Sequence, residues 1–508
     1  MTGRRSTGPS STCSPPTSGQ NFAGRRPQHR RSIGMPRELA RVPARSASIE
    51  PLHSLLEDAA WDVFIRTMRD TATQLKNRTI WNINSTVRGG GVAEMLAWQI
   101  PYERGAGMDV RWLVIQGGTP FFTFTKRLHA LLHGIAADGS MINDAERKEY
   151  AQTLAGNAEA VAREIQPRDI VILHDPQTAG LAPYFVRHGC RVIWRCHIGV
   201  DQPNEVAKGA WRFLLPHVAA AHATVFSRRA YVWEGLDQQR VDIIPPAIDA
   251  FAPKNEELNG ETVAAVLRIT GILADGPAGQ PRLKVGAIAV ERTTDLFPAA
   301  RLPEDARLTV QVSRWDRLKD PLGVMEGFAQ FVAPRVDSHL ILAGPGVSTV
   351  ADDPEEAEVL REVEDRWHHL APAARDRVHL ARLPMDDAQE NAIIVNALQR
   401  RAQVVVQKSL GEGFGLTVAE AMWKGRPVVA SRVGGIQDQI EHGKSGLLID
   451  DPHDLAAFGA AVVSVFSDTG AADRLGAEAK RRVQRQFLAP RQMMQQAQLV
   501  GRLLQHAT

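Results

Sequence analysis

Residues 407–425, "QKSLGEGFGLTVAEAMWKG", place two glutamates eight positions apart, Glu412 and Glu420, across a glycine-rich loop. The preceding "VVVQKS" reads as a buried strand, and "LTVAEAMWKG" predicts a helix that ends at Gly425. Glycines in "LGEGFG" let the backbone approach a ligand closely. We therefore expect Glu412 to face a ligand on the loop, and Glu420 to reach a ribose diol from the helix.

This stretch belongs to an alternation of strand and helix patterns that covers most of the chain and is typical of parallel sheets. At 508 residues the chain is too long for a single core. The predicted fold is α/β, with two doubly wound, Rossmann-like domains. In such sheets ligands bind beyond the carboxyl ends of the strands, here across a cleft between the domains. The prolines of "VDIIPPAIDA" (241–250) would form the hinge.

We predict four segments. Residues 1–50 form a disordered basic leader, with nine arginines against only Glu38 and Glu50. A transit peptide, or a true start at Met35, are alternative interpretations of this leader. The first Rossmann-like domain spans 51–247 and the second spans 248–484, with an insertion or linker at 254–306. Residues 485–508 form a helix that crosses back to the first domain.

The composition argues against a nucleic-acid-binding, membrane-spanning or secreted protein. The chain is 44% hydrophobic and 23% charged, with a formal net charge of +3 that comes from the leader. The near-neutral body does not suggest a nucleic-acid partner. No apolar run approaches the roughly 20 residues that a membrane span needs, and a secretory signal is missing, so we expect a cytoplasmic protein. The three cysteines form neither a disulfide framework nor a CxxC zinc pair.

Two glycine-rich motifs fail as nucleotide fingerprints. After Gly89, Gly90 and Gly91, a dinucleotide motif needs glycine where Glu94 stands. "HGKSG" (442–446) would be a P-loop only with glycine at position 438, which is Asp438. What remains at Gly90 and Gly91 is a tight turn before a helix, either a plain βα turn or one whose N–H groups face a phosphate.

"SRWDRLKDP" places Arg314 and Lys319 directly after an apolar strand. Charges at strand ends are commonly just solvated. Two cations at this edge of the sheet can also hold a diphosphate, the arginine as a fork and the lysine as a point charge.

"EGFGLTVAE" matches the E-x7-E motif of retaining glycosyltransferase family 4, whose fold is GT-B. Within that family the chain most resembles the trehalose synthases of the glycosyltransferring type and their relatives, the trehalose phosphorylases. The resemblance covers about residues 80–250 and 308–450. It rests further on "NSTVRGGGVAEML", "FFTFTKRLHALLHG", "LHDPQTAGL", "WRCHI" and "IPPAID".

The resemblance implies a reversible, retaining transfer of glucose from a nucleoside diphosphate glucose (ADP, UDP or GDP) to glucose, which forms trehalose. It implies the following roles for positions of this sequence. The catalytic residues would be His197, Arg314, Lys319 and Glu412. The donor would contact Gly90, Gly91, Arg314, Lys319, Arg382, Leu383, Glu412, Gly413, Phe414, Gly415, Leu416 and Glu420, with Arg382 and Leu383 near the base. The acceptor would contact Asn84, Asp175 and Gln177.

No metal site and no cofactor are expected, although Mg²⁺ could accompany the nucleotide sugar, and a homodimer is compatible with the sequence. The chain departs from the family pattern where Gly199 replaces an expected aspartate, with Asp201 two positions on. Three alternatives remain: a trehalose phosphorylase, another family 4 glucosyltransferase, and a sugar-nucleotide-binding protein without catalysis.

Overall fold

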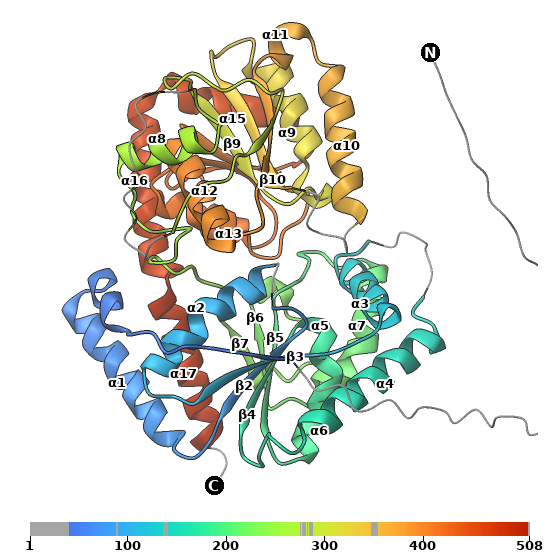
Figure 1. Ribbon diagram of the computed structural model, residues 1–508. Coiled ribbons are helices and arrows are strands. Elements are labelled where there is room, and N and C mark those ends of the chain that lie inside the picture. The colour runs from blue at the N-terminus through green and yellow to red at the C-terminus, as the bar shows by residue number, and fades with distance from the viewer. Residues whose placement is uncertain are drawn as a thin grey trace, which may run out of the picture. The chain divides into compact units, whose positions relative to one another are not determined.

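A computed structural model describes residues 40–505, except 88–89, 136–140, 275, 277–280, 282, 284–287 and 347–353. Its described residues form two seven-stranded, mostly parallel sheets with helices on both faces (Figure 1). The predicted pair of doubly wound α/β domains is therefore confirmed.

The N-terminal sheet has the strand order β1-β3-β2-β4-β5-β6-β7. Its central strands read as nearly continuous apolar runs because helices cover both faces. In β4, for example, all five residues are buried. The strands are β1 (Ala40–Val42), β2 (Ile80–Asn84), β3 (Val110–Val114), β4 (Ile170–His174), β5 (Arg191–Cys196), β6 (Ala223–Phe226) and β7 (Val241–Ile243).

Longer helices and short helical turns connect these strands. The α-helices of this half are α1 (Asp58–Gln74), α2 (Gly91–Gly105), α3 (Thr119–Leu132), α4 (Asp144–Val161), α5 (Asp175–Thr178), α6 (Ala182–Arg187) and α7 (Glu205–Val218). The 3-10 turns are η1 (Glu50–Leu55), η2 (Ala179–Leu181), η3 (Arg229–Tyr231) and η4 (Gln238–Arg240).

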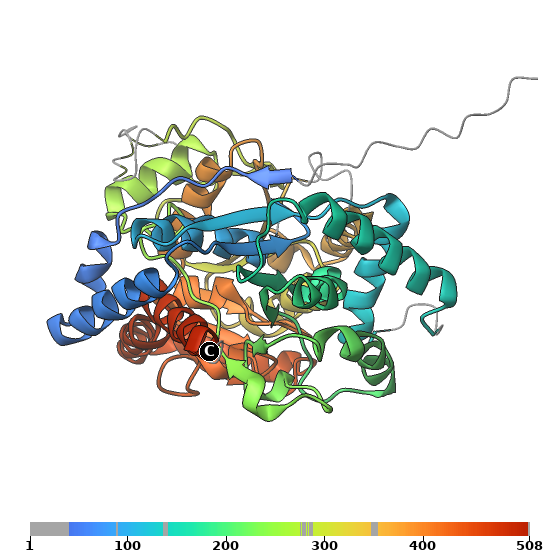
Figure 2. The same ribbon diagram turned by 90° about the horizontal axis from the view of Figure 1, so that it is seen from below.

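The end of the basic leader is ordered, which corrects the prediction of disorder through residue 50. Strand β1 pairs antiparallel with β3 at the edge of the sheet (Figure 2). Ala47 donates its N–H to the carbonyl of Pro101. Its own carbonyl oxygen lies 1.7 Å from where a Cβ of Gly105 would stand, so only glycine permits this contact. Residues 1–39 lie outside the described residues.

The C-terminal sheet has the order β14-β13-β12-β9-β10-β11-β8, and all its pairs are parallel except β11 with β8. The strands are β8 (Asp295–Phe297), β9 (Leu308–Val312), β10 (His339–Pro345), β11 (Val378–Leu383), β12 (Val404–Gln407), β13 (Val428–Ser431) and β14 (Leu447–Ile449).

The helices of this half are α8 (Gly260–Ile269), α9 (Pro321–Gly327), α10 (Pro354–His368), α11 (Pro372–Arg375), α12 (Ala388–Arg401), α13 (Leu416–Trp423), α14 (Ile436–Gln439), α15 (Leu455–Ser467) and α16 (Thr469–Gln486). The 3-10 turn η5 (Arg317–Lys319) and the π-helical turn η6 (Phe328–Val332) complete it.

The sequence predicts an insertion or linker at residues 254–306. Their described part instead contributes helix α8, which packs on α12, and the edge strand β8. The segment has little hydrophobic periodicity because part of its length is turn, yet it completes the second sheet.

Helix α17 (Ala489–Gln505) leaves the C-terminal half and packs against α1 and α2 (Figure 1). A buried polar network fixes it there. Gln496 of α17 donates to Glu103 of α2 at 3.0 Å and accepts from Arg195 of β5 at 3.1 Å. Gln492 donates to Gln99, which in turn donates to Glu103 at 2.8 Å. Burial raises the pKa of Glu103 from its ordinary 4.5 to about 7, although Gln99 and the charge of Arg195 oppose that rise.

Because of this raised pKa, the free energy of unfolding should depend on pH. The variant Glu103→Gln should remove that dependence. Native Glu103 keeps its proton up to about pH 7, whereas the unfolded chain loses it near pH 4.5. The free energy of unfolding therefore falls as the pH rises through this window. Between about pH 5 and about pH 8 we expect wild type to lose roughly 1–3 kcal/mol relative to Glu103→Gln. Urea denaturation of both proteins at the two pH values measures this loss, and parallel pH dependences would contradict it.

Among the described residues no single helix is long and apolar enough to cross a membrane, and only α15 and α16 together, bent by 103°, meet the criteria of length and composition.

Candidate functional site

The glycine-rich loop between β12 and α13 packs tightly against the N-terminal half. Gly415, the residue before α13, has φ +86°, a left-handed conformation that favours glycine. A Cβ on Gly413 would stand 2.8 Å from the carbonyl oxygen of His197. The loop can therefore approach this segment of the N-terminal half only with glycine at 413. Phe414 is buried, and Leu416 begins the helix.

On this loop Glu412 forms an ion pair with Lys319, whose Nζ lies 2.5 Å from Oε2 of the glutamate. The two residues are 93 positions apart in sequence, and their side chains are 11% and 18% exposed. Lys319 is fixed by neighbours, since the side chain of Gln311 donates to its carbonyl at 2.8 Å. The next residue, Asp320, is paired with the buried Lys408. The structure thus brings a carboxylate and an ammonium group together at the ends of β9 and β12.

Arg314 lies on the same β9 loop. Its guanidinium is 2.8 Å from Asp316, and its side chain is 55% exposed. Asp316 also accepts from the N–H of Leu318 at 2.7 Å and so orders the turn that carries Lys319.

Two histidines that sequence reasoning did not single out face this charged group from the other half. His129 in α3 and His133 at its end have ring centroids 4.8 Å apart. Burial lowers the pKa of His129 to about 3, and the positive charges of Arg314 and Lys319 act in the same direction. The pKa of His133 is also lowered by burial, while the charge of Glu412 opposes this. "FFTFTKRLHALLHG" matches a family motif, but nothing in this stretch indicates that both rings face the C-terminal half.

Glu420 lies in helix α13, which follows the loop, and its side chain is 1% exposed. Lys254 is 3.4 Å from its Oε1, while Oε2 has no hydrogen-bond partner among the described residues. Burial raises the pKa of Glu420, and the charge of Lys254 opposes that rise. The predicted phosphate turn is adjacent, because a Cβ on Gly91 would lie 3.1 Å from Cδ1 of Leu416, and Gly90 has φ +85°.

His197 ends a chain of hydrogen bonds within the N-terminal half. Its Nε2 is 3.1 Å from Nδ1 of His174, whose Nε2 is 3.0 Å from Oδ1 of Asn82. Burial, with the charge of Arg195 and the His174 ring, holds the pKa of His197 well below its usual range. The imidazole is therefore neutral, and its ring is oriented by the chain behind it.

Two of the three predicted acceptor residues, Asp175 and Gln177, lie on the short helix α5. Asp175 accepts from the backbone N–H of His197 at 2.7 Å, and burial raises its pKa to about 7. Gln177 follows on the same short helix, and its Oε1 is buried without a hydrogen-bond partner among the described residues. Asn84, in contrast, accepts from the Trp112 indole at 2.8 Å and donates to the carbonyl of Thr86 at 2.7 Å. Both ends of the Asn84 amide are thus engaged internally, which does not support a role in acceptor binding.

The predicted base contacts, Arg382 and Leu383, are the last two residues of strand β11. Arg382 pairs with Glu364 at 2.6 Å and with Asp295 at 2.8 Å. Leu383 is 2% exposed. The side chain of Arg382 is therefore committed to α10 and β8.

Gly199 and Asp201, where the family pattern is broken, have structural roles. A Cβ on Gly199 would lie 2.3 Å from the Tyr231 ring, so a larger residue cannot stand there. Asp201 accepts from the N–H of Gly434 at 3.0 Å and from Gln437 at 2.9 Å, and it pairs with Arg228. It therefore ties the N-terminal half to the loop after β13.

Among the described residues, no group of three or more His, Cys, Asp or Glu side chains could hold a metal ion. A cavity of about 910 Å³ lies elsewhere, between α1 and the turn at 105–109, and none of the predicted site residues lines it.

The chain is similar to known proteins over most of its length. Residues 82–233 match the family described as "Trehalose synthase, N-terminal domain", and residues 293–482 match "Glycosyl transferases group 1". The chain is 34% identical to the trehalose synthase of Rubrobacter xylanophilus, over 86% of this chain and 93% of that one. It is 27% identical to the trehalose phosphorylase of Grifola frondosa, over 79% of this chain but 54% of the phosphorylase.

Among solved structures, "Trehalose-6-phosphate from E. coli bound with UDP-2-fluoro glucose" has a similar fold. The TM-score is 0.63 at 12% identity, over 84% of this chain and 99% of that one.

Proposed function

Because the chain belongs to the trehalose synthase family of glycosyltransferases and has the GT-B fold, we propose that it transfers glucose from a nucleoside diphosphate glucose to free glucose. The product is trehalose, and the reaction is reversible. One observation carries the proposal: the glycine loop sets Glu412 against Lys319, while Glu420 is buried in the helix that follows the loop. Glu412 would bind the donor sugar, Lys319 the diphosphate and Glu420 the ribose.

The surroundings of Glu420 favour a nucleotide sugar over free phosphate as the ligand. Oε2 of Glu420 is buried without a hydrogen-bond partner among the described residues, and such an atom costs free energy until it accepts a hydrogen bond. A ribose hydroxyl supplies that bond, whereas a phosphorylase that uses free phosphate has no ribose to offer. The same fold holds UDP-2-fluoro glucose in the E. coli structure, which supports a nucleotide sugar as the donor.

The proposed reaction is a substitution on one face of the sugar. The bond between the anomeric carbon and the diphosphate oxygen breaks, and its electron pair stays on the diphosphate. The acceptor hydroxyl oxygen bonds to the same face of that carbon, and its proton passes to the leaving diphosphate oxygen. Arg314, Lys319 and the N-terminus of α13 stabilise the growing negative charge.

The N-terminal half would orient the sugars. Neutral His197 can exchange a hydrogen bond with a sugar hydroxyl, since its other ring nitrogen is held by His174. Asp175 and Gln177 would bind the acceptor from the adjacent short helix. Burial keeps the pKa of Asp175 at about 7, so this carboxyl can donate as well as accept near neutral pH.

Tyr231 holds the Glu412 loop from across the two halves, and Tyr231→Phe should expose that role. Its hydroxyl lies 2.8 Å from the carbonyl oxygen of Glu412 and 3.0 Å from that of Gly413. Phenylalanine keeps the ring over Gly199 but removes this donor. We expect the free energy of unfolding to fall by about 1 kcal/mol and kcat to fall about tenfold. Urea denaturation and steady-state kinetics measure the two effects, and an unchanged kcat would show that the loop needs no such support.

The forward reaction tests the proposed function. Purified protein is incubated with glucose and, in turn, ADP-, UDP- and GDP-glucose, and the disaccharide is identified by NMR. We expect α,α-trehalose with at least one donor. A different disaccharide would assign another acceptor, and release of glucose or no product with any donor would contradict the proposal.

A further inference from the structure

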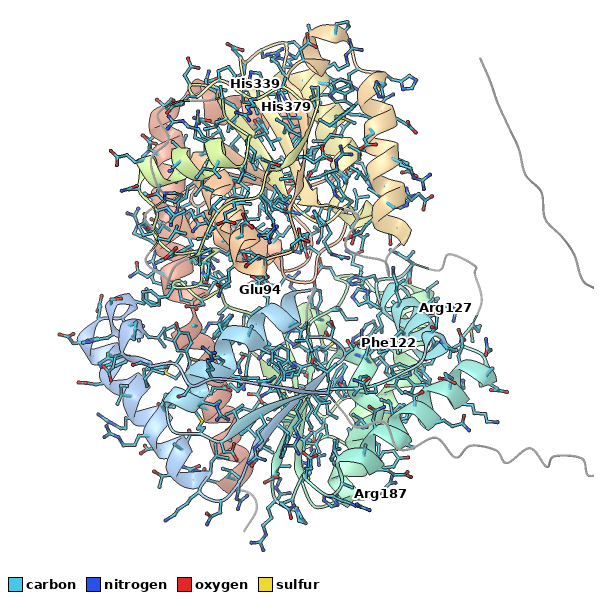
Figure 3. All side chains as sticks on the ribbon, viewed as in Figure 1. Glu94, Phe122, Arg127, Arg187, His339 and His379 are labelled. Atoms are coloured by element: carbon cyan, nitrogen blue, oxygen red, sulfur yellow. The ribbon has the colours of Figure 1, made fainter. Side chains whose placement is uncertain are left out.

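Lys254 lies between two carboxylates that come from different halves of the protein. Its Nζ is 2.8 Å from Oε1 of Glu94 in α2 and 3.4 Å from Oε1 of Glu420 in α13. Figure 3 labels Glu94 on the first turn of α2. The Lys254 side chain is 21% exposed and that of Glu94 is 44% exposed, whereas Glu420 is nearly inaccessible. No family motif marked this lysine in the sequence.

The backbone around Lys254 is held against the C-terminal half. Asn396 of α12 donates to the carbonyl of Pro253 at 2.9 Å. On the other side, Trp423 of α13 donates to the carbonyl of Asn255 at 3.2 Å. The ammonium group is therefore presented to Glu420 by a segment fixed on both sides.

A second lysine close to Glu420, Lys424, does not contact the carboxylate as Lys254 does. Nζ of Lys424 is bonded to Oδ1 of Asn255 and to the backbone carbonyl of Glu420, both at 3.2 Å, and not to the Glu420 carboxylate. Burial lowers the pKa of Lys424 to about 7. Arg400 of α12 adds a further positive charge near Lys424.

The charges around Glu420 therefore have opposite effects on its pKa. Burial and the charge of Glu94 raise the pKa of Glu420, while Lys254 and Lys424 lower it. A protonated carboxyl would have fewer lone pairs for ribose hydroxyls than an ionised one. Lys254 contacts Oε1, so Oε2 is the buried carboxylate oxygen without a hydrogen-bond partner among the described residues.

We infer that Lys254 is a positioning residue for the nucleotide: its ammonium group pairs with Oε1 of Glu420 and leaves Oε2 to accept a hydrogen bond from the ribose diol. This inference rests on the proposed function, because it assumes that a nucleoside diphosphate binds beside Glu420. Lys254 acts through Glu420 and does not itself bond to the ribose.

The test compares Lys254→Met with a matched control, Lys480→Met. Lys480 is also near α13, but it packs on the Trp423 ring and pairs with Glu257. The probes are whichever of ADP, UDP and GDP wild type binds, and the 2′,3′-dideoxy form of that nucleotide, titrated calorimetrically from about pH 6 to about pH 9. A wild type that binds none of the three diphosphates would overturn the proposed function, and this inference with it.

Near pH 7 we expect Lys254→Met to bind the ribonucleotide about tenfold more weakly, a loss that shrinks as Glu420 ionises at higher pH. The dideoxy nucleotide should bind wild type and Lys254→Met equally, and Lys480→Met should match wild type throughout. In a Glu420→Gln background, Lys254→Met should have no further effect. The inference would be contradicted if Lys254→Met lost the same affinity for both nucleotides, or if the losses added in the Lys254→Met/Glu420→Gln double variant. Lys254 would then have only a structural role.

A milder variant covers the case in which Lys254→Met does not fold. Glu94→Gln removes the charge that raises the pKa of Glu420 and leaves Lys254 to Glu420 alone. We expect ribonucleotide binding to remain tight to a lower pH than in wild type. A pH profile identical to that of wild type would overturn the inference.

Discussion

Replacing Lys319 by methionine is expected to lower kcat/KM by about 10²–10³. Its ammonium group is the fixed positive charge at the predicted diphosphate position, held by Gln311 through the backbone and paired with Glu412. Methionine keeps the length and apolar packing of the side chain and removes only the charge. The leaving diphosphate would then lose a partner at the moment its charge develops. Steady-state kinetics of trehalose cleavage with the preferred nucleoside diphosphate measures this loss.

Arg317→Met provides the matched control, two residues earlier on the same turn. Arg317 points away to α10, where it pairs with Glu362 at 2.7 Å and Glu358 at 3.2 Å. These pairs are exposed, so we expect kcat/KM to change by about twofold or less. If Lys319→Met and Arg317→Met behaved alike, the Lys319 charge would have no special part in catalysis.

Glu412→Gln is expected to lower kcat by about 10²–10³ without weakening the binding of the nucleoside diphosphate. The amide keeps the shape of the side chain but loses the charge that would hold the donor sugar hydroxyls. It also releases Lys319 from its ion pair, so the lysine becomes fully available to the diphosphate. Single-turnover kinetics and calorimetry separate the two effects.

The control for this change is Glu441→Gln, an exposed carboxylate after α14 that pairs with Lys444. It should leave kcat unchanged. In the double variant Lys319→Met/Glu412→Gln, the two losses should not add, because the residues interact directly. A Glu412→Gln enzyme with wild-type kcat, or one that binds the diphosphate tenfold more weakly, would contradict the role assigned to Glu412.

Much of the fold could be predicted from local patterns. Apolar runs such as "IVILH" are buried strands because helices cover both faces of the sheet. Residues 40–50 could not be predicted because the contacts that order them come from distant parts of the sequence: residues 40–42 pair with β3, and Ala47 donates to Pro101.

The site could be predicted only where a motif carries the chemistry. Glu412 and Glu420 follow from one continuous stretch, whereas the contact of Glu412 with Lys319 joins residues 93 positions apart. Lys254 has no local motif, because the two carboxylates that it contacts, Glu94 and Glu420, lie far from it in the sequence, Glu94 by 160 positions. The direction of a strand-end side chain such as Arg382 depends on which neighbours the fold supplies, here Glu364 and Asp295.

The most direct measurement runs the reaction backwards. Purified protein is incubated with trehalose plus ADP, UDP or GDP, and separately with trehalose plus inorganic phosphate, and the activated sugar is identified by mass spectrometry. We predict a nucleoside diphosphate glucose from at least one nucleotide, which also names the base, and no glucose 1-phosphate. Glucose 1-phosphate from the phosphate reaction, with no sugar nucleotide from any of the three, would contradict the account and make the protein a phosphorylase.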